Sequence, residues 1–313
     1  MTSRTNGTRK TRRLRVLLTL VLATALAANA DDSSEKKPGI DTVVITAQKR
    51  RELDRQISHF VFGAVVSYMN DSLERWDTPI CPLVAGLSGD RGEFVFTRVT
   101  EIAKAAHAHL GEEHCKPNFY IVVTAYPDLL LAKWVKRDIG LVNNCNGMGY
   151  IKSFLHSRQP VRVFYNAVFR SSTGMNHSLD TAGTDLIGLN LPFNLSPCAA
   201  VDPHPPDSRL RYGVVQELSS VIVVVDSTKT TNINIGQLTD YVALLGLAQI
   251  KPEANPGTAP SILNLFRETG LPAPQGLSPW DEAFLHSLYT TDQTSTLQVS
   301  VIKGRMLDEL ANH

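Results

Sequence analysis

The stretch Pro117-Asn118-Phe119-Tyr120-Ile121-Val122-Val123-Thr124 is the clearest buried strand in this sequence. It is rich in β-branched and aromatic side chains, which favour the packed surface of a sheet. Two further strands are predicted along the chain on either side of it, over residues 80–87 and 161–169. The three- and four-residue spacing of apolar side chains predicts the helices, which are 53–76, 95–110, 129–135, 235–250, 279–289 and 297–311.

Strands in the first half and a helical C-terminal third indicate an α+β fold, in which helices pack on a mixed or antiparallel sheet. Residues 209–226 end in the run Val221-Ile222-Val223-Val224-Val225, which fits a helix or a strand. We expect residues 41–313 to form a single α+β domain. Residues 171–208 are rich in proline and glycine and are predicted to form a long irregular loop within that domain.

The composition excludes two broad classes of protein. The chain has 313 residues, of which 43% are hydrophobic and 19% are charged, and its formal net charge is +1. It is too apolar for a disordered protein, and it lacks the excess of basic residues typical of nucleic-acid binders. We therefore expect a globular protein without a nucleic-acid partner.

Residues 1–30 have the organisation of a secretory signal peptide. They contain six basic residues and no acidic one, followed by an apolar run at 16–27 and the small-residue site Ala28-Asn29-Ala30. Cleavage is expected after Ala30, which leaves residues 31–40 as a flexible leader. The apolar run is shorter than the roughly 18 residues that span a bilayer. The mature protein is therefore expected in the periplasm or outside the cell, and not as an integral membrane protein.

Four cysteines, an even number, fit disulfide bonds in an exported chain. They are Cys81, Cys115, Cys145 and Cys198. Three pairings are open, and we favour Cys81–Cys115 with Cys145–Cys198, because each pair then lies within one stretch of neighbouring elements. The predicted role of these bonds is structural.

Residues 43–50, Val-Val-Ile-Thr-Ala-Gln-Lys-Arg, resemble the segment that opens the plug of TonB-dependent outer-membrane receptors. The similarity covers about ten residues, and the chain lacks the many barrel strands of those receptors. The resemblance of this segment implies that the protein has a partner protein in the cell envelope. From its residues alone, the stretch 41–50 is predicted to be an apolar strand flanked by turns.

Three segments near the C-terminus are Pro-Ser-Ile-Leu-Asn-Leu-Phe at 260–266, Gly-Leu-Ser-Pro-Trp-Asp at 276–281 and Phe-Leu-His-Ser-Leu-Tyr at 284–289. Together they resemble the end of a matrixin-type zincin metallopeptidase, and also related bacterial exported domains of unknown function. In that family a turn with a buried methionine precedes a leucine–serine pair, an aspartate and a helix ending in leucine–tyrosine. The resemblance implies a zincin-like fold. The same residues also fit a core helix with Ser278 as its N-cap.

The resemblance further implies an upstream helix that carries the zinc signature H-E-x-x-H-x-x-G-x-x-H. Residues 216–226 are the candidate, with Glu217 in the place of the general base and Asp226 in the place of the third ligand. Gln216 and Ser220 stand where the two histidines belong, and Val223 replaces the glycine. Catalytic zinc needs three protein ligands and an open position for water. The missing histidines therefore predict that no zinc or other cofactor is bound there.

Two hypotheses about function remain open. The first is a non-catalytic exported protein, built on a degenerate metallopeptidase scaffold, with a role in binding or at the cell envelope. The alternative is an active exported hydrolase with zinc, in which Glu217 and Asp226 combine with His177 or His204 from the 171–208 loop. A serine hydrolase has no support, because the motif G-x-S-x-G is absent.

Overall fold

The structure is a computed structural model, and it describes residues 40–65, 73–137, 147–171, 209–270 and 272–312. Its contacts divide the chain into two units, Met1–Gln48 and Lys49–His313. The described part of the first unit is the beginning of helix α2 (Ile40–Ala64). The second unit contains the sheet and the remaining helices. The predicted signal peptide with Ala28 and Ala30, and the leader up to residue 39, lie outside the described residues.

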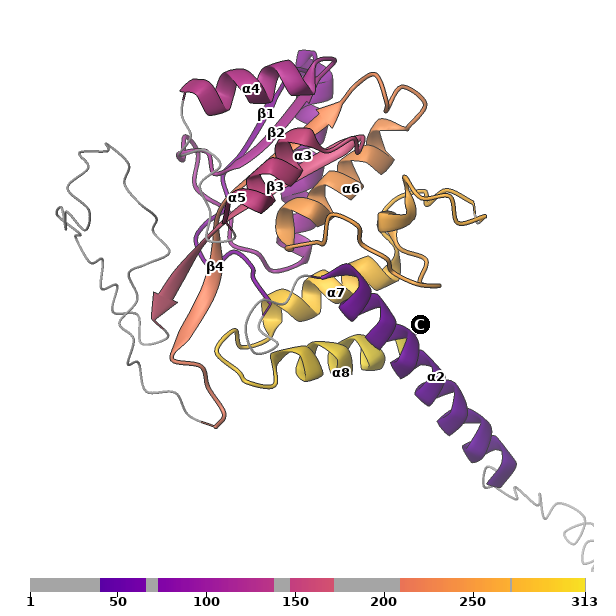
Figure 1. Cartoon of the computed structure of the whole chain (residues 1–313). Coiled ribbons are helices and arrows are strands. Elements are labelled where there is room, and N and C mark those ends of the chain that lie inside the picture. The colour runs from indigo at the N-terminus through magenta and orange to yellow at the C-terminus, as the bar shows by residue number, and fades with distance from the viewer. Residues whose placement is uncertain (1–39, 66–72, 138–146, 172–208, 271, 313) are drawn as a thin grey trace, which may run out of the picture. The chain divides into compact units, whose positions relative to one another are not determined.

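A mixed four-stranded sheet organises the second unit (Figure 1). Its strands are β1 (Pro82–Ala85), β2 (Phe119–Thr124), β3 (Val161–Ser171) and β4 (Val214–Asp226). The spatial order is β1-β2-β4-β3, in which β1, β2 and β4 run parallel and β3 pairs antiparallel with β4. A mixed sheet with packed helices confirms the α+β prediction.

Most of the predicted helices are present, with ends shifted by a few residues. The helices are α3 (Gly89–Ala105), α4 (Pro127–Arg137), α5 (Gly147–His156), α6 (Ile235–Leu247), α7 (Pro279–Thr290), α8 (Gln298–Ala311) and the short 3₁₀ helix η3 (Ile262–Asn264). The sequence did not predict α5. Among the described residues, no helix combines the length and the apolar character that crossing a bilayer would require.

Strand β4 is buried on both faces of the sheet. Val221, Val223 and Val225 pack into the large core shared with α3 and α6, whereas Ile222 and Val224 pack into a smaller core with residues of α4 and α5. A strand covered on both sides carries a continuous apolar run and not an alternating one. This is why the spacing of residues 221–225 could not distinguish a strand from a helix.

Two local predictions were wrong. Residues 41–50 are helical within α2 and not a strand, because once a helix has formed it extends at little cost over a segment of neutral or even strand-favouring residues. The helix predicted over 53–76 ends at Ala64, and Arg75 instead forms a parallel bridge with Glu217 of β4. The backbone carbonyl of Arg75 accepts a hydrogen bond from the Leu218 amide at 2.9 Å.

Helix α7 begins with the predicted cap. The Ser278 side chain accepts a hydrogen bond from the Asp281 amide, and the Asp281 carboxylate accepts one in return from the Ser278 amide. Asp281 is completely buried, and it also accepts hydrogen bonds from Ser261 Oγ at 2.5 Å and the Ile262 amide at 2.9 Å. One carboxylate therefore joins the start of α7 to the turn that contains η3.

A disulfide bond joins Cys81 to Cys115, with their Cα atoms 6.0 Å apart, and confirms this pairing. It links the residue before β1 to the segment that leads into β2. The other two predicted partners, Cys145 and Cys198, lie outside the described residues.

Candidate functional site

Glu217 and Asp226 both lie on strand β4, and not on the helix that the zinc signature requires. They are nine residues apart, and a strand rises about 3.3 Å per residue, so roughly 30 Å separates their backbones. Gln216 and Ser220 are about 13 Å apart by the same measure. The structure therefore does not bring these residues together. The two loop histidines of the alternative hypothesis, His177 and His204, lie outside the described residues.

Glu217 forms a buried ion pair near one end of β4. Its side chain is 3% exposed, and Arg170 Nη2 donates a hydrogen bond to Oε1 at 2.6 Å. Arg170 also pairs with the exposed Asp77, at 3.1 Å. Burial raises the pKa of Glu217, and the contact with Arg170 offsets only part of that rise. These contacts give Glu217 a role in joining β4 to β3.

Asp226 ends β4 and organises the turn that follows. Its Oδ1 accepts hydrogen bonds from the Thr228 amide at 3.0 Å and from Thr228 Oγ1 at 2.6 Å, and Lys229 Nζ lies 3.6 Å from Oδ2. Burial acts to raise the pKa of Asp226, but the bonds from Thr228 and the charge of Lys229 outweigh it and lower the pKa. This arrangement is an Asx-type turn, which is a structural role.

The helix that directly precedes the turn at Ser261 is α6, and the zinc signature can be placed on it. If Gly246 takes the place of the signature glycine, the three histidine positions fall on Thr239, Ala243 and Gln249, and the glutamate position falls on Asp240. All three residues at the histidine positions are at most 1% exposed. The sequence had predicted the signature at 216–226, and α6 carries no histidine that would have indicated this register.

The end of α6 is held by close packing and by hydrogen bonds from aromatic side chains. A Cβ added at Gly246 would lie 1.8 Å from the Phe119 ring, so only glycine allows α6 to approach β2 this closely. The last carbonyls of a helix have no partner within it. Here Leu245, Gly246 and Leu247 accept hydrogen bonds from Tyr165 Oη, Trp76 Nε1 and Tyr289 Oη, at 2.9, 2.8 and 2.7 Å.

Asp240 connects three segments of the second unit. Arg98 of α3 donates to it from Nε at 2.7 Å and from Nη2 at 3.0 Å, and the Leu277 amide donates to Oδ2 at 2.9 Å. The side chain of Asp240 is 4% exposed. A general base must present a free lone pair to its substrate. The contacts of Asp240 instead make it a structural anchor.

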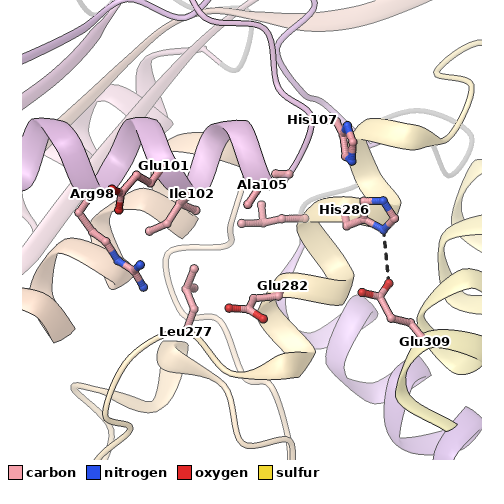
Figure 2. Close-up of a pocket in the computed structure, with 11 residues that line it drawn as sticks. Arg98, Glu101, Ile102, Ala105, His107, Leu277, Glu282, His286 and Glu309 are labelled. Carbon is pink, nitrogen blue, oxygen red and sulfur yellow. Dashed lines mark hydrogen bonds and ion pairs between the residues drawn. The ribbon is translucent and has the colours of Figure 1, made fainter. Parts of the chain in front are cut away.

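A pocket of about 490 Å³ opens between the end of α3, residue Leu277, and helices α7 and α8 (Figure 2). Both apolar and polar side chains line it, and the polar ones are Arg98, Glu101, His107, Glu282, His286 and Glu309. Asp240, outside the lining, neutralises the charge of Arg98. The carboxylates of Glu101, Glu282 and Glu309 therefore make the polar lining predominantly negative. Such a lining favours a cation over an anion.

The fold brings together two histidines that the sequence left apart. The ring centroids of His107 and His286 are 5.2 Å apart, and His286 Nδ1 lies 3.4 Å from Glu309 Oε2 (Figure 2). Their spacing along the chain gives no sign of this proximity. Among the residues that the structure describes, no three histidine, cysteine, aspartate or glutamate side chains are grouped as a metal site.

Comparison with known proteins gives no relative from which a function could be transferred. No family model matches this chain, and neither a curated protein nor a solved structure matches it.

Proposed function

We propose that this protein is an exported, non-catalytic scaffold related to zincin metallopeptidases, and that it acts by binding at the cell envelope or outside the cell. The single observation that carries the proposal is the burial of the α6 positions. Thr239, Ala243 and Gln249 are 1%, 0% and 0% exposed and include no good zinc ligand. They provide neither three ligands nor an open position for water.

The region after α6 supports the kinship. The turn at Ser261 contains the buried Leu263 near the place where the family has a buried methionine, and Asp281 holds this turn through Ser261 Oγ. Gly246, in the place of the signature glycine, is fixed by its close approach to the Phe119 ring. These features would be retained in a scaffold that has lost its metal ligands but kept its packing.

The disulfide supports the export part of the proposal. Disulfides persist in oxidising compartments and are rare in the cytosol of most organisms. Cys81 and Cys115 form one, and the signal-like residues 1–30 account for how the chain would reach such a compartment. The role at the envelope, and the protein partner there, rest on the segment 43–50 alone.

A peptidase assay tests the non-catalytic part. Purified residues 31–313, supplied with Zn²⁺, would be incubated with a broad library of fluorogenic peptides beside the Glu217→Gln variant. We expect no cleavage above the buffer rate by either protein. Cleavage by the unmodified chain that Glu217→Gln abolishes would favour the hydrolase alternative, provided that both proteins give the same far-ultraviolet circular dichroism.

Fractionation tests the export part independently. The full chain, expressed in a bacterial host, should be recovered outside the cytoplasm with Asp31 as its first residue and with Cys81 and Cys115 oxidised. Recovery of the uncleaved chain from the cytoplasm with free thiols would contradict export, whatever the peptidase assay shows.

A further inference from the structure

We propose that His107 and His286 form an open binding site for a divalent transition-metal ion, with Zn²⁺ as its probe, and that Glu309 orients His286. This inference goes beyond the proposed function and does not depend on it. The site lies in the pocket between α3, α7 and α8, and none of its residues belongs to the signature positions on α6.

The separation of the two rings suits a shared ion. Imidazole nitrogens bind Zn²⁺ at about 2.0–2.1 Å, so two histidines that ligate one ion have neighbouring rings. The centroids of His107 and His286 are 5.2 Å apart, and their planes are inclined by 49°. Figure 2 shows the two rings next to each other at one side of the pocket, with Glu309 beside His286.

Glu309 gives His286 the partner that a metal-binding histidine usually has. A ligating histidine commonly donates its second ring N–H to a carboxylate, which fixes the tautomer and the ring orientation. His286 Nδ1 lies 3.4 Å from Glu309 Oε2. With the proton on Nδ1, the lone pair of Nε2 is free to bind an ion.

The backbone at His107 suits a glycine, which makes a folded variant without this imidazole available for a test. The Ala108 amide bonds the Ala103 carbonyl and the His107 amide bonds the Lys104 carbonyl, which is the Schellman ending of helix α3. His107 occupies the left-handed position of this motif, with φ of 65°. Glycine is the preferred residue there because a side chain is disfavoured. At His107 the backbone conformation would favour glycine, but the residue is histidine.

The surroundings allow an ion to enter and favour its charge. The side chains of His286 and Glu309 are 41% and 36% exposed, so water can complete the coordination shell. Glu101 and Glu282 add negative charge to the same pocket. Imidazole is a suitable ligand for zinc, copper and nickel, and two protein ligands predict weaker binding than a closed four-ligand site.

Isothermal titration calorimetry with Zn²⁺ on tag-free residues 31–313 tests the proposal. We expect one equivalent to bind, His107→Gly and His286→Ala to weaken binding at least about tenfold, and Glu309→Gln to weaken it about 10- to 100-fold. His107→Gly should fold at least as well as the unmodified chain, because glycine suits this backbone position.

His114→Gly is the matched control, because His114 is also an exposed histidine with a left-handed backbone, at φ of 64°, but does not line the pocket. It should bind Zn²⁺ like the unmodified chain. Absence of binding to the unmodified chain would overturn the proposal. So would equal binding by the unmodified chain and the folded His107→Gly and His286→Ala variants.

Discussion

Arg98 of α3 and Asp240 of α6 form a two-point ion pair, with Nε donating to Oδ1 at 2.7 Å and Nη2 donating to Oδ2 at 3.0 Å. The same Oδ2 accepts the Leu277 amide at 2.9 Å. Asp240 is thereby the point where two core helices and the segment before α7 meet. The carboxylate of Asp240 therefore holds these parts of the fold together.

Asp240→Asn should therefore destabilise the protein. The amide keeps one acceptor oxygen but loses the charge and one of the two bonds to Arg98, which leaves that guanidinium partly unpaired. Because the Arg98 side chain is 38% exposed, we expect a loss of about 2 kcal/mol and not the full cost of breaking a buried pair. Urea unfolding measures the loss. Arg91→Ala, on an exposed position of α3, is the control, and equal stability of the two variants would contradict this role.

A substitution at Gly246 tests the packing of α6 against β2. In Gly246→Ala the new methyl group would lie within 2.5 Å of three carbons of the Phe119 ring, so the helix or the ring must move. Overpacking of this kind typically costs about 1–3 kcal/mol, and we expect the upper end. Gly304→Ala in α8 is the matched control, because nothing lies within 4 Å of its new methyl group. It should stabilise the protein by up to about 1 kcal/mol, and a similar gain for Gly246→Ala would be inconsistent with the tight contact.

Glu74 predicts a dependence of stability on pH. Its side chain is buried, neither carboxylate oxygen has a hydrogen-bond partner among the described residues, and burial raises its pKa to about 8. The pKa of the unfolded chain is near the ordinary value of 4.5. Between these values the folded state binds more protons than the unfolded state, so the contribution of Glu74 to stability falls as pH rises from about 4.5 to 8.

Glu74→Gln removes that titration. The quantity to follow is the free energy of unfolding of the variant minus that of the unmodified chain. Between pH 5 and pH 8 this difference should increase by on the order of 3 kcal/mol in favour of the variant. Urea unfolding at several pH values measures this difference. Glu93→Gln, at an exposed position of α3, is the control. A constant difference between Glu74→Gln and the unmodified chain from pH 5 to pH 8 would mean that folding does not raise the pKa of Glu74.

The disulfide should contribute substantially to stability. Cys81 and Cys115 are 34 residues apart, and closing a loop of that length in the unfolded chain stabilises the folded state by about 4 kcal/mol. The double variant Cys81→Ala/Cys115→Ala should therefore unfold at a lower urea concentration than the oxidised chain. Adding a reductant should lower the stability of the unmodified chain by more than that of the double variant, because the predicted Cys145–Cys198 bond would be reduced in both. If the reductant had no effect on the unmodified chain, the bond would be absent or without energetic consequence.

Much of the fold could be predicted because local signals and packing agree. Strand β2 has β-branched residues on a short apolar segment, and α7 has its Ser278 cap, so both were found with small errors at their ends. The type of β4 could not be decided, because burial on both faces removes the alternation that identifies a strand. Residues 41–50 were predicted to be a strand, but they are part of helix α2. The helical residues that follow them in α2 outweigh their own preference for a strand.

The candidate site was less predictable than the fold. His107 and His286 meet only because α3 and α7 line one pocket, and no spacing along the chain encodes that. The register on α6 was visible in principle, since Gly246 and Ser261 follow in the expected order. The signature was expected at 216–226 instead, because Thr239, Ala243 and Gln249 of α6 fit a helix core and include no histidine.

Helix α6 is a packed core helix, and we propose that it does not bind a metal ion. An anomalous difference map at the zinc absorption edge, from a crystal of residues 31–313 soaked in Zn²⁺, tests it most directly. The map should show no zinc within coordinating distance of Thr239, Ala243 or Gln249, where the interior is filled by side chains. A zinc peak bonded to Gln249 or Asp240, with water at an open coordination position, would contradict the claim.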